Sequence, residues 1–166
     1  MSTSQIQSVV ASITLQLLDG LAHIHTHNIV HNDIRPANIL VNPILTMHGE
    51  ILMSGGYHAK IADFEYAQLV PTSKVRDDVG EEKERESEER EAPPHPKSLN
   101  YRAPERLKSN LLFGPSVDIW ALGCSIYELL TGVFYAEGTD EQEVLDSILS
   151  HNTFIPYTVH RSLEHR

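Results

Sequence analysis

The stretch that decides the fold reads His31-Asn32-Asp33-Ile34-Arg35-Pro36-Ala37-Asn38. In this octapeptide an aspartate stands five residues before an asparagine, and a histidine opens the run. Three further stretches follow it in order: Lys60-Ile61-Ala62-Asp63-Phe64-Glu65, then Tyr101-Arg102-Ala103-Pro104-Glu105, and then Ser116-Val117-Asp118-Ile119-Trp120-Ala121-Leu122-Gly123. The octapeptide alone would be a moderate signal, but the segments taken together in this order are specific.

With these motifs the chain resembles the large, C-terminal lobe of a eukaryotic protein kinase of serine/threonine type. The resemblance implies a mainly α fold with a small β-hairpin, which is a truncated form of the α+β kinase fold. We expect one lobe over residues 1–150 and a tail over residues 151–166. Within the lobe, the resemblance implies a catalytic loop at 31–38 and an activation segment at 63–105.

The resemblance also implies catalytic roles for single residues, with ATP and Mg²⁺ as cofactors. Asp33 would accept or orient the proton of the attacking hydroxyl, and Arg35 would place a positive charge near the transferred phosphate. Asn38 and Asp63 would hold the magnesium ion. Leu40 would lie beneath the adenine, although a plain core leucine is an equally good interpretation of that position.

Structural roles are implied for a second set of residues, namely His31, Phe64, Ser98, Glu105 and Asp118. His31 would pack against Phe64, and the hydroxyl of Ser98 would hydrogen-bond the catalytic aspartate. Glu105 corresponds to a glutamate that pairs with an arginine near the end of a complete lobe, so it is expected to lack a partner. Asp118 would accept backbone hydrogen bonds from the catalytic loop; the alternative is an N-terminal residue that interacts only with the helix dipole.

Two departures from the family pattern limit how much function the resemblance implies. Asn32 stands where many protein kinases have an arginine that clamps a phosphate on the activation segment, which suggests that no such phosphate controls this chain. Glu65 replaces a glycine that permits a backbone flip. An acidic residue at position 65 also fits small-molecule kinases that act on choline or aminoglycosides, which remain an alternative. The sequence around Pro36 and Tyr101–Glu105 favours the serine/threonine type.

The family's Gly-rich phosphate loop and strand lysine do not occur among the residues before His31. The chain is therefore expected to be incomplete as an enzyme, and a non-catalytic pseudokinase or binding fragment is a further alternative. The expected partners are a protein substrate with a serine or threonine hydroxyl and, as a candidate, a separate N-lobe or a partner kinase.

Hydrophobic spacing predicts the elements that carry these motifs. Ser4 and Gln7 resemble a capping box that opens a helix of about twenty residues. Short strands are expected at 38–42 and 57–62, with an insertion between them. Residues 116–132 are apolar nearly all round, which predicts a helix buried on every side, and a further helix is expected at 140–149.

Composition restricts the remaining possibilities. The formal net charge of −10 argues against nucleic acid or an anionic membrane as partner. Half of this charge lies in residues 76–91, where nine acidic residues face four basic ones. The surrounding insert, residues 77–96, is expected to be disordered, with an acidic docking element for basic substrates as the alternative.

The histidines and the cysteine are expected to have no catalytic role. His23 and His27 lie one helical turn apart, but no zinc-type set of ligands surrounds them, so structural or surface histidine is favoured. Cys124, the only cysteine, lies in the apolar 116–132 stretch and is expected to be a buried hydrophobic residue. A single cysteine also excludes an internal disulfide, so we expect an intracellular, cytoplasmic or nuclear location.

Overall fold

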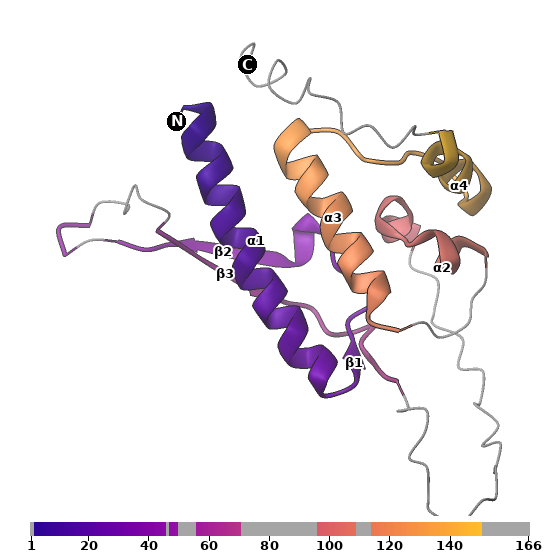
Figure 1. Ribbon diagram of the computed structural model, residues 1–166, viewed down its shortest axis with the longest axis horizontal. Helices are drawn as coiled ribbons and strands as arrows, with labels where there is room; N and C mark the ends of the chain where they lie inside the picture. The colour runs from indigo at the N-terminus through magenta and orange to yellow at the C-terminus, as the bar shows by residue number, and fades with distance from the viewer. Residues whose placement is uncertain (1, 46, 50–55, 71–95, 109–113, 151–166) are drawn as a thin grey trace, which may run out of the picture.

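The computed structural model describes residues 2–45, 47–49, 56–70, 96–108 and 114–150. Figure 1 shows two long helices side by side, with a β-hairpin behind the first and two shorter helices beyond the second. In chain order the elements are α1 (Thr3–Thr26), β1 (Ile29–Val30), η1 (Pro36–Asn38), β2 (Ile39–Pro43), β3 (Tyr57–Ile61), β4 (Gln68–Leu69), η2 (Pro96–Tyr101), α2 (Pro104–Lys108), α3 (Ser116–Thr131) and α4 (Glu141–Ser150). The predicted fold class, mainly α with a small β-hairpin, is confirmed.

Helix α1 begins two residues earlier than the sequence pattern predicts. Its capping box is formed by Ser2 and Gln5, because the Ser2 hydroxyl accepts from the Gln5 backbone N–H at 3.3 Å and the Gln5 side-chain oxygen accepts from the Ser2 N–H at 2.7 Å. The prediction of a box at Ser4 and Gln7 is therefore wrong. Both pairs have the same spacing, and the earlier one lengthens the helix to 24 residues.

The hairpin of β2 and β3 leads out of the 31–38 loop and back to Asp63. The two strands are antiparallel, with Ile39 opposite Ile61 and Pro43 opposite Tyr57. The other edge of β3 is held by Gln16 of α1, whose amide nitrogen donates to the Tyr57 carbonyl at 2.9 Å and whose oxygen accepts from the Ala59 N–H at 3.1 Å. One glutamine side chain thus satisfies backbone groups that a further strand would otherwise pair with.

Helix α3 packs against α1 and η2, but it is not buried on every side as predicted. Its buried side chains include Asp118 and Leu122, whereas Ile119, Gly123 and Leu129 are exposed. Apolar residues also occur singly on protein surfaces, so composition alone overestimates burial. The helix ends at Gly132, whose φ of 75° is the left-handed conformation that glycine adopts without strain.

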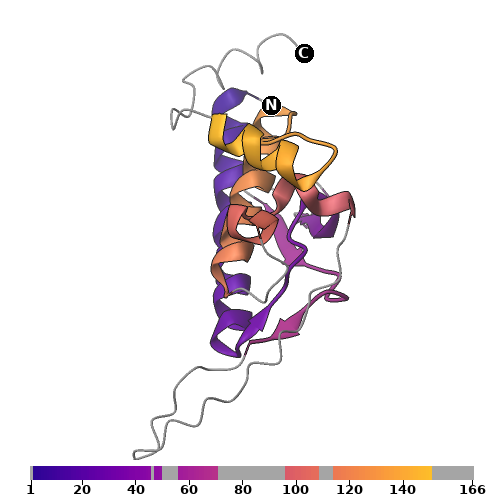
Figure 2. The ribbon, with the colours of Figure 1, turned by 90° about the vertical axis from the view of Figure 1, so that its right-hand side faces the viewer.

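Helices η2, α2 and α4 form the remaining part of the described chain, which Figure 2 shows from the side. Helix η2 begins at Pro96, the last residue of the predicted insert, and a proline without an N–H suits a first helical turn. The rest of the insert, residues 77–95, and the tail at 151–166 lie outside the described residues. Helix α4 begins at Glu141, after Asp140 accepts from the Glu143 N–H at 2.9 Å.

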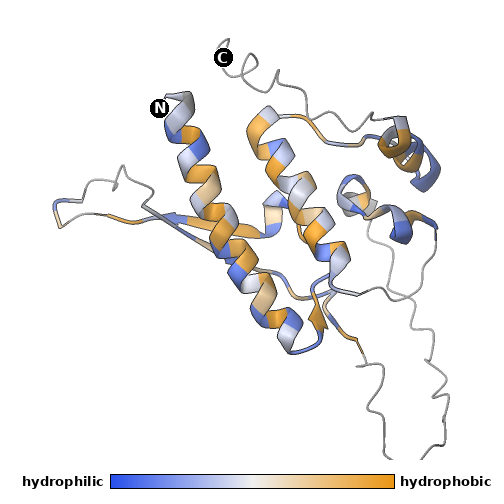
Figure 3. Cartoon of the chain, in the orientation of Figure 1, coloured by the Kyte–Doolittle hydropathy of each residue, from blue (hydrophilic) through white to orange (hydrophobic). Residues whose placement is uncertain are grey.

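The main hydrophobic core lies between α1 and α3, where Figure 3 shows apolar residues along both helices. We call this group the central cluster; its buried members are Ile13, Leu17, Leu21, Ile34, Tyr101, Ala121, Leu122 and Cys124. A second group, the α2–α4 cluster, contains Leu107, Ala136, Val144 and Leu145. Among the described helices, none is both long enough and apolar enough to cross a bilayer.

Candidate active site

The 31–38 loop is fixed to the core by a buried carboxylate on α3. The backbone N–H groups of His31 and Asn32 donate to the two oxygens of Asp118, at 2.8 Å and 2.9 Å. Asp118 itself is only 1% exposed. The hydrogen bonds expected of this residue are present, and its place in the first turn of α3 adds a favourable interaction with the helix dipole. The loop is therefore attached to α3 through two backbone hydrogen bonds.

A histidine that the sequence interpretation treated as surface or structural completes this attachment. The Nε2 atom of His25 lies 2.8 Å from Oδ2 of Asp118. His25 continues the series Ile13, Leu17 and Leu21 at four-residue steps, so it lies on the buried face of α1. That spacing is the signal that could have identified His25 as a partner for a buried acid.

His31 is fully buried and joins the loop to the segment after β3. Its Nδ1 accepts from the Asp33 N–H at 3.3 Å, and its Nε2 faces the Ala62 carbonyl at 3.1 Å. An acceptor at Nδ1 and a carbonyl at Nε2 require the neutral tautomer with its proton on Nε2. Burial lowers the pKa of His31 from its ordinary value, against the opposing effect of the nearby Asp118 charge. The ring also contacts Phe64 edge to face, at 4.7 Å between centroids, as the resemblance implies.

Asp33 has one oxygen held and one oxygen without a partner. Its Oδ2 accepts from Nδ2 of Asn38 at 2.7 Å and from Nε of Arg35 at 3.0 Å. Its Oδ1 is buried and has no hydrogen-bond partner within the described part of the chain. Since buried polar atoms are normally satisfied, an unpaired carboxylate oxygen at this place is the most informative atom of the site. The structure thus brings together Asp33, Arg35 and Asn38, which the sequence singled out.

Asn38 and Asp63 lie at the ends of neighbouring strands. The Asn38 carbonyl accepts from the Ala62 N–H at 2.9 Å, which places Asp63 directly beyond this backbone pair. Nδ2 of Asn38 is turned toward the side chain and backbone of Asp33, which leaves its Oδ1 as an oxygen donor. Asp63 is exposed and has a φ of 65°. An amide oxygen and an exposed carboxylate are the hard oxygen ligands that Mg²⁺ prefers, so the residues present fit that ion.

The other predicted site residues are less closely connected. Leu40 is 53% exposed, so its interpretation as a plain core leucine is wrong, and its place beneath an adenine stays a prediction. The Ser98 side chain lies outside what the structure describes, although its backbone belongs to η2. Glu105 is half-buried at the start of α2, and within the described residues its side chain makes no hydrogen bond or ion pair.

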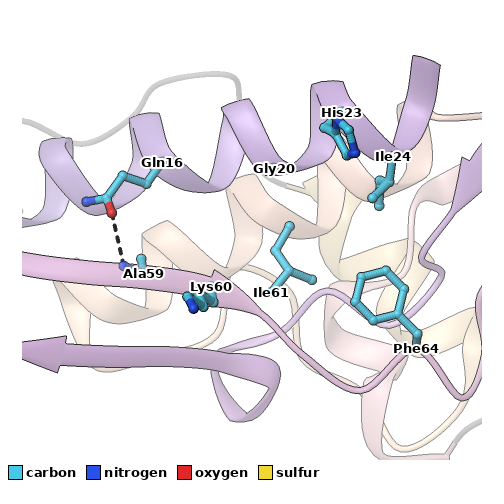
Figure 4. Close-up of a pocket in the computed structure, with 8 residues that line it drawn as sticks. All are labelled: Gln16, Gly20, His23, Ile24, Ala59, Lys60, Ile61 and Phe64. Carbon is cyan, nitrogen blue, oxygen red and sulfur yellow. Dashed lines mark hydrogen bonds between the residues drawn. The ribbon is translucent and has the colours of Figure 1, made fainter. Parts of the chain in front are cut away.

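A pocket of about 350 Å³ has Phe64 among the residues that line it (Figure 4). It opens between α1 and β3, next to the hydrogen bond from the Ala59 N–H to Gln16. Its apolar lining comes from Gly20, Ile24, Ala59, Ile61 and Phe64. Asp33, Asn38 and Asp63 do not line it, although Phe64, which does, contacts His31 of the polar site.

The remaining histidines and the cysteine have the surroundings of structural residues. His23 and His27 are exposed and their rings contact each other at 4.7 Å. Within the described ranges, no three His, Cys, Asp or Glu side chains gather as metal ligands would. Burial raises the pKa of the Cys124 thiol to about 12, so at neutral pH it is protonated and weakly nucleophilic. The expectation that Cys124 is a buried hydrophobic residue is confirmed.

Comparison with known proteins identifies the family. The family model described as protein kinase domain matches residues 2–165. Human cyclin-dependent kinase-like 4 is 38% identical over 125 residues, which are 75% of this chain and 25% of that protein. A probable cyclin-dependent serine/threonine-protein kinase of Dictyostelium discoideum is 33% identical over 133 residues, or 80% of this chain and 7% of that protein. Cyclin-dependent kinase-like 1 of Caenorhabditis elegans is 32% identical over 124 residues, or 75% of this chain and 27% of that protein.

The chain therefore spans about a quarter of these relatives or less. The match over residues 2–165 favours a protein kinase over the small-molecule kinase alternative. Protein kinases in general use ATP and Mg²⁺, which agrees with the oxygen donors at Asn38 and Asp63. The chain belongs to the protein kinase domain family, and the Dictyostelium relative is by its name a serine/threonine-protein kinase.

Proposed function

We propose that this site transfers the γ-phosphoryl group of ATP to a serine or threonine hydroxyl of a protein. The observation that supports the proposal most is the state of Asp33, with Oδ2 held by two donors and Oδ1 buried and unpaired. A carboxylate fixed through one oxygen can use the other to accept a proton in a defined direction. Oδ1 of Asp33 is shielded from solvent, so the protein atoms that cover it would have to move before a substrate hydroxyl could reach it.

In the proposed reaction the hydroxyl oxygen forms a bond to the γ-phosphorus. The bond between that phosphorus and the β–γ bridging oxygen breaks, and ADP leaves with the electron pair. The hydroxyl proton passes to Oδ1 of Asp33, which later releases it to water. Arg35 orients Asp33 through its Nε, and its two terminal nitrogens suit a pair of phosphate oxygens.

Asn38 and Asp63 would hold Mg²⁺, and His31 would keep the backbone around them in place. The ion, when bound, neutralises charge on the phosphate oxygens. Leu40 is exposed on β2 next to Asn38, which suits an apolar contact with a base. The 166 residues hold no Gly-rich phosphate loop before His31. We therefore expect this chain alone to bind ATP weakly and to transfer phosphate slowly.

A second candidate is a binding fragment without catalysis, which Glu65 favours because it stands where the family has a glycine that permits a backbone flip. The two candidates differ in what Asp33 does. A purified preparation of the 166-residue chain is given Mg²⁺, γ-labelled ATP and a basic protein, and transfer is compared among wild type, Asp33→Asn and Asp19→Asn. Asp19 is exposed on α1, so its variant controls for the loss of one charge.

We expect Asp33→Asn to lower transfer at least about a hundredfold, which is the scale of general base catalysis. Asp19→Asn should transfer at the wild-type rate, and calorimetry should give the same weak ATP binding for all three proteins. If the chain binds ATP but shows no phosphate transfer that Asp33→Asn reduces, the binding-fragment alternative replaces the proposal.

A further inference from the structure

The side-chain amide of Asn32 joins three segments that are distant in sequence. Its Nδ2 donates to the Tyr66 carbonyl at 3.0 Å and, more weakly, to the Val30 carbonyl at 3.4 Å. Its Oδ1 accepts from Nη1 of Arg106 at 3.2 Å. The catalytic loop is thereby connected to the segment that follows Phe64 and to α2.

The backbone at this position also favours asparagine. Asn32 has a φ of 66°, in the left-handed region where asparagine is tolerated far better than most side chains. Its N–H is at the same time bonded to Asp118. Residue 32 is therefore constrained by its backbone, by a buried carboxylate and by its own amide, directly before Asp33.

Arg106, the partner of Asn32, is a buried cation at only 9% exposure. Within the described residues no carboxylate forms an ion pair with it. Burial and the charge of Arg102 lower the pKa of its guanidinium from the ordinary value. A second arginine at position 32, as the resemblance implies for many family members, would face this buried charge, whereas the amide oxygen of Asn32 accepts a hydrogen bond from it without a like-charge contact.

We infer that Asn32 is a positioning residue, which holds Asp33 in place by bonding the 66–70 segment and α2 through neutral hydrogen bonds that need no phosphate. As a statement about catalysis, this rests on the proposed function; as a statement about order in the site, it does not. Where family members have an arginine at this position, the resemblance implies that it clamps a phosphate on the activation segment. In this chain the equivalent connection is already made by an amide.

The test uses two asparagines with the same backbone conformation. Asn28 has a φ of 59° and an exposed side chain, for which no hydrogen bond occurs among the described residues. Asn32→Gly and Asn28→Gly both keep the left-handed backbone without strain, but only Asn32→Gly removes the bridging amide. Asn32→Asp is a third variant, which keeps an acceptor for Arg106 and loses the donor to Tyr66.

The first measurement is amide hydrogen exchange in the full 166-residue chain, resolved over residues 66–70 and 104–108. We expect Asn32→Gly to speed exchange about tenfold in both segments, and Asn28→Gly to change it less than about threefold, since each lost hydrogen bond contributes modestly. Asn32→Asp should speed exchange at 66–70 and leave 104–108 protected. Equal exchange in Asn32→Gly and Asn28→Gly would overturn the inference, whether or not the chain transfers phosphate.

The second measurement is kinetic and uses the same preparations. We expect Asn32→Gly to lower kcat about tenfold with the KM for ATP within about twofold of wild type, because Asp33 is misplaced while the nucleotide contacts persist. Treatment of the wild type with a phosphatase should leave kcat unchanged. A wild type without any transfer would contradict the proposed function, and the exchange result would still decide the role of Asn32. A loss of activity on phosphatase treatment would contradict the phosphate-free arrangement.

Discussion

At the scale of single residues, the site depends on a carboxylate that takes no part in the proposed chemistry. Asp118 accepts the backbone N–H groups of His31 and Asn32, and its Oδ2 also lies against Nε2 of His25. A buried carboxylate is costly unless its oxygens are hydrogen-bonded, and here each oxygen has a partner. The same contacts fix the first two residues of the 31–38 loop, so the stability of the fold and the geometry of the candidate site are linked at this residue.

Asp118→Ala should therefore be one of the most destabilising single substitutions in the chain. It strands two buried backbone donors, each at about 1–3 kcal/mol, so we expect a loss of about 3 kcal/mol in the free energy of unfolding. Urea melts measure this against Asp146→Ala, which removes an exposed carboxylate that bonds only Gln142 in the described chain. The control should change stability by less than about 0.5 kcal/mol. Similar losses in the two variants would show that Asp118 is not the attachment point of the loop.

At the residue level, the expectations came from the family resemblance rather than from local pattern. The contact of His31 with Phe64, which the resemblance implies, is present, and Asn38 donates a hydrogen bond to Asp33. The exposure of Leu40 and the pairing of His25 with Asp118 depend on how α1, α3 and β2 pack, which no local pattern contains. The functional roles of the site residues stay predictions, since geometry alone does not measure chemistry.

At the scale of elements, the sequence predicted the order and type of the helices and strands better than their ends. The hairpin at 38–42 and 57–62 is present as 39–43 and 57–61, and along β3 half-buried residues alternate with exposed ones as a strand requires. The start of α1 was misplaced because two Ser-x-x-Gln pairs compete within six residues. The burial of α3 was overestimated because the apolar content of a helix does not reveal how many neighbours cover it.

The entry to α4 depends on a glycine whose role only the structure reveals. A Cβ at Gly138 would lie 2.5 Å from the Val144 nitrogen and 2.7 Å from Cβ of Glu143. Gly138→Ala therefore forces backbone to move, and we expect a loss of about 2 kcal/mol in the free energy of unfolding, on the scale of overpacking. Helical order at α4 can be followed by hydrogen exchange at the same time.

Gly123 is the matched control for this substitution. It lies on the exposed face of α3, and a Cβ there would meet nothing within 4 Å. Gly123→Ala should stabilise the protein by up to about 1 kcal/mol, because alanine favours a helix more than glycine does. A thermal melt in which Gly138→Ala is as stable as Gly123→Ala would mean that the loop before α4 adapts freely.

At the scale of the whole molecule, two hydrophobic clusters are joined through one aromatic residue. Tyr135 packs against both the central cluster and the α2–α4 cluster. Its ring also contacts Trp120 and Tyr127 of α3 edge to face, at 6.0 Å and 5.4 Å between centroids. Because α2 carries Arg106, the partner of Asn32, this packing connects the outer helices to the 31–38 loop.

Tyr135→Ala should therefore separate the two clusters before it unfolds the chain. We expect hydrogen exchange to increase in α2 and α4 by a larger factor than in α1, because α1 keeps its contacts with β3 and α3. Global stability should fall by about 2 kcal/mol, below the scale of a fully buried aromatic residue since Tyr135 is half-buried. Tyr135→Phe keeps the ring and should change exchange in α2 and α4 much less. A uniform increase over all four helices in Tyr135→Ala would mean that the molecule opens as a single unit, and that the outer helices cannot loosen while the loop stays attached to Asp118.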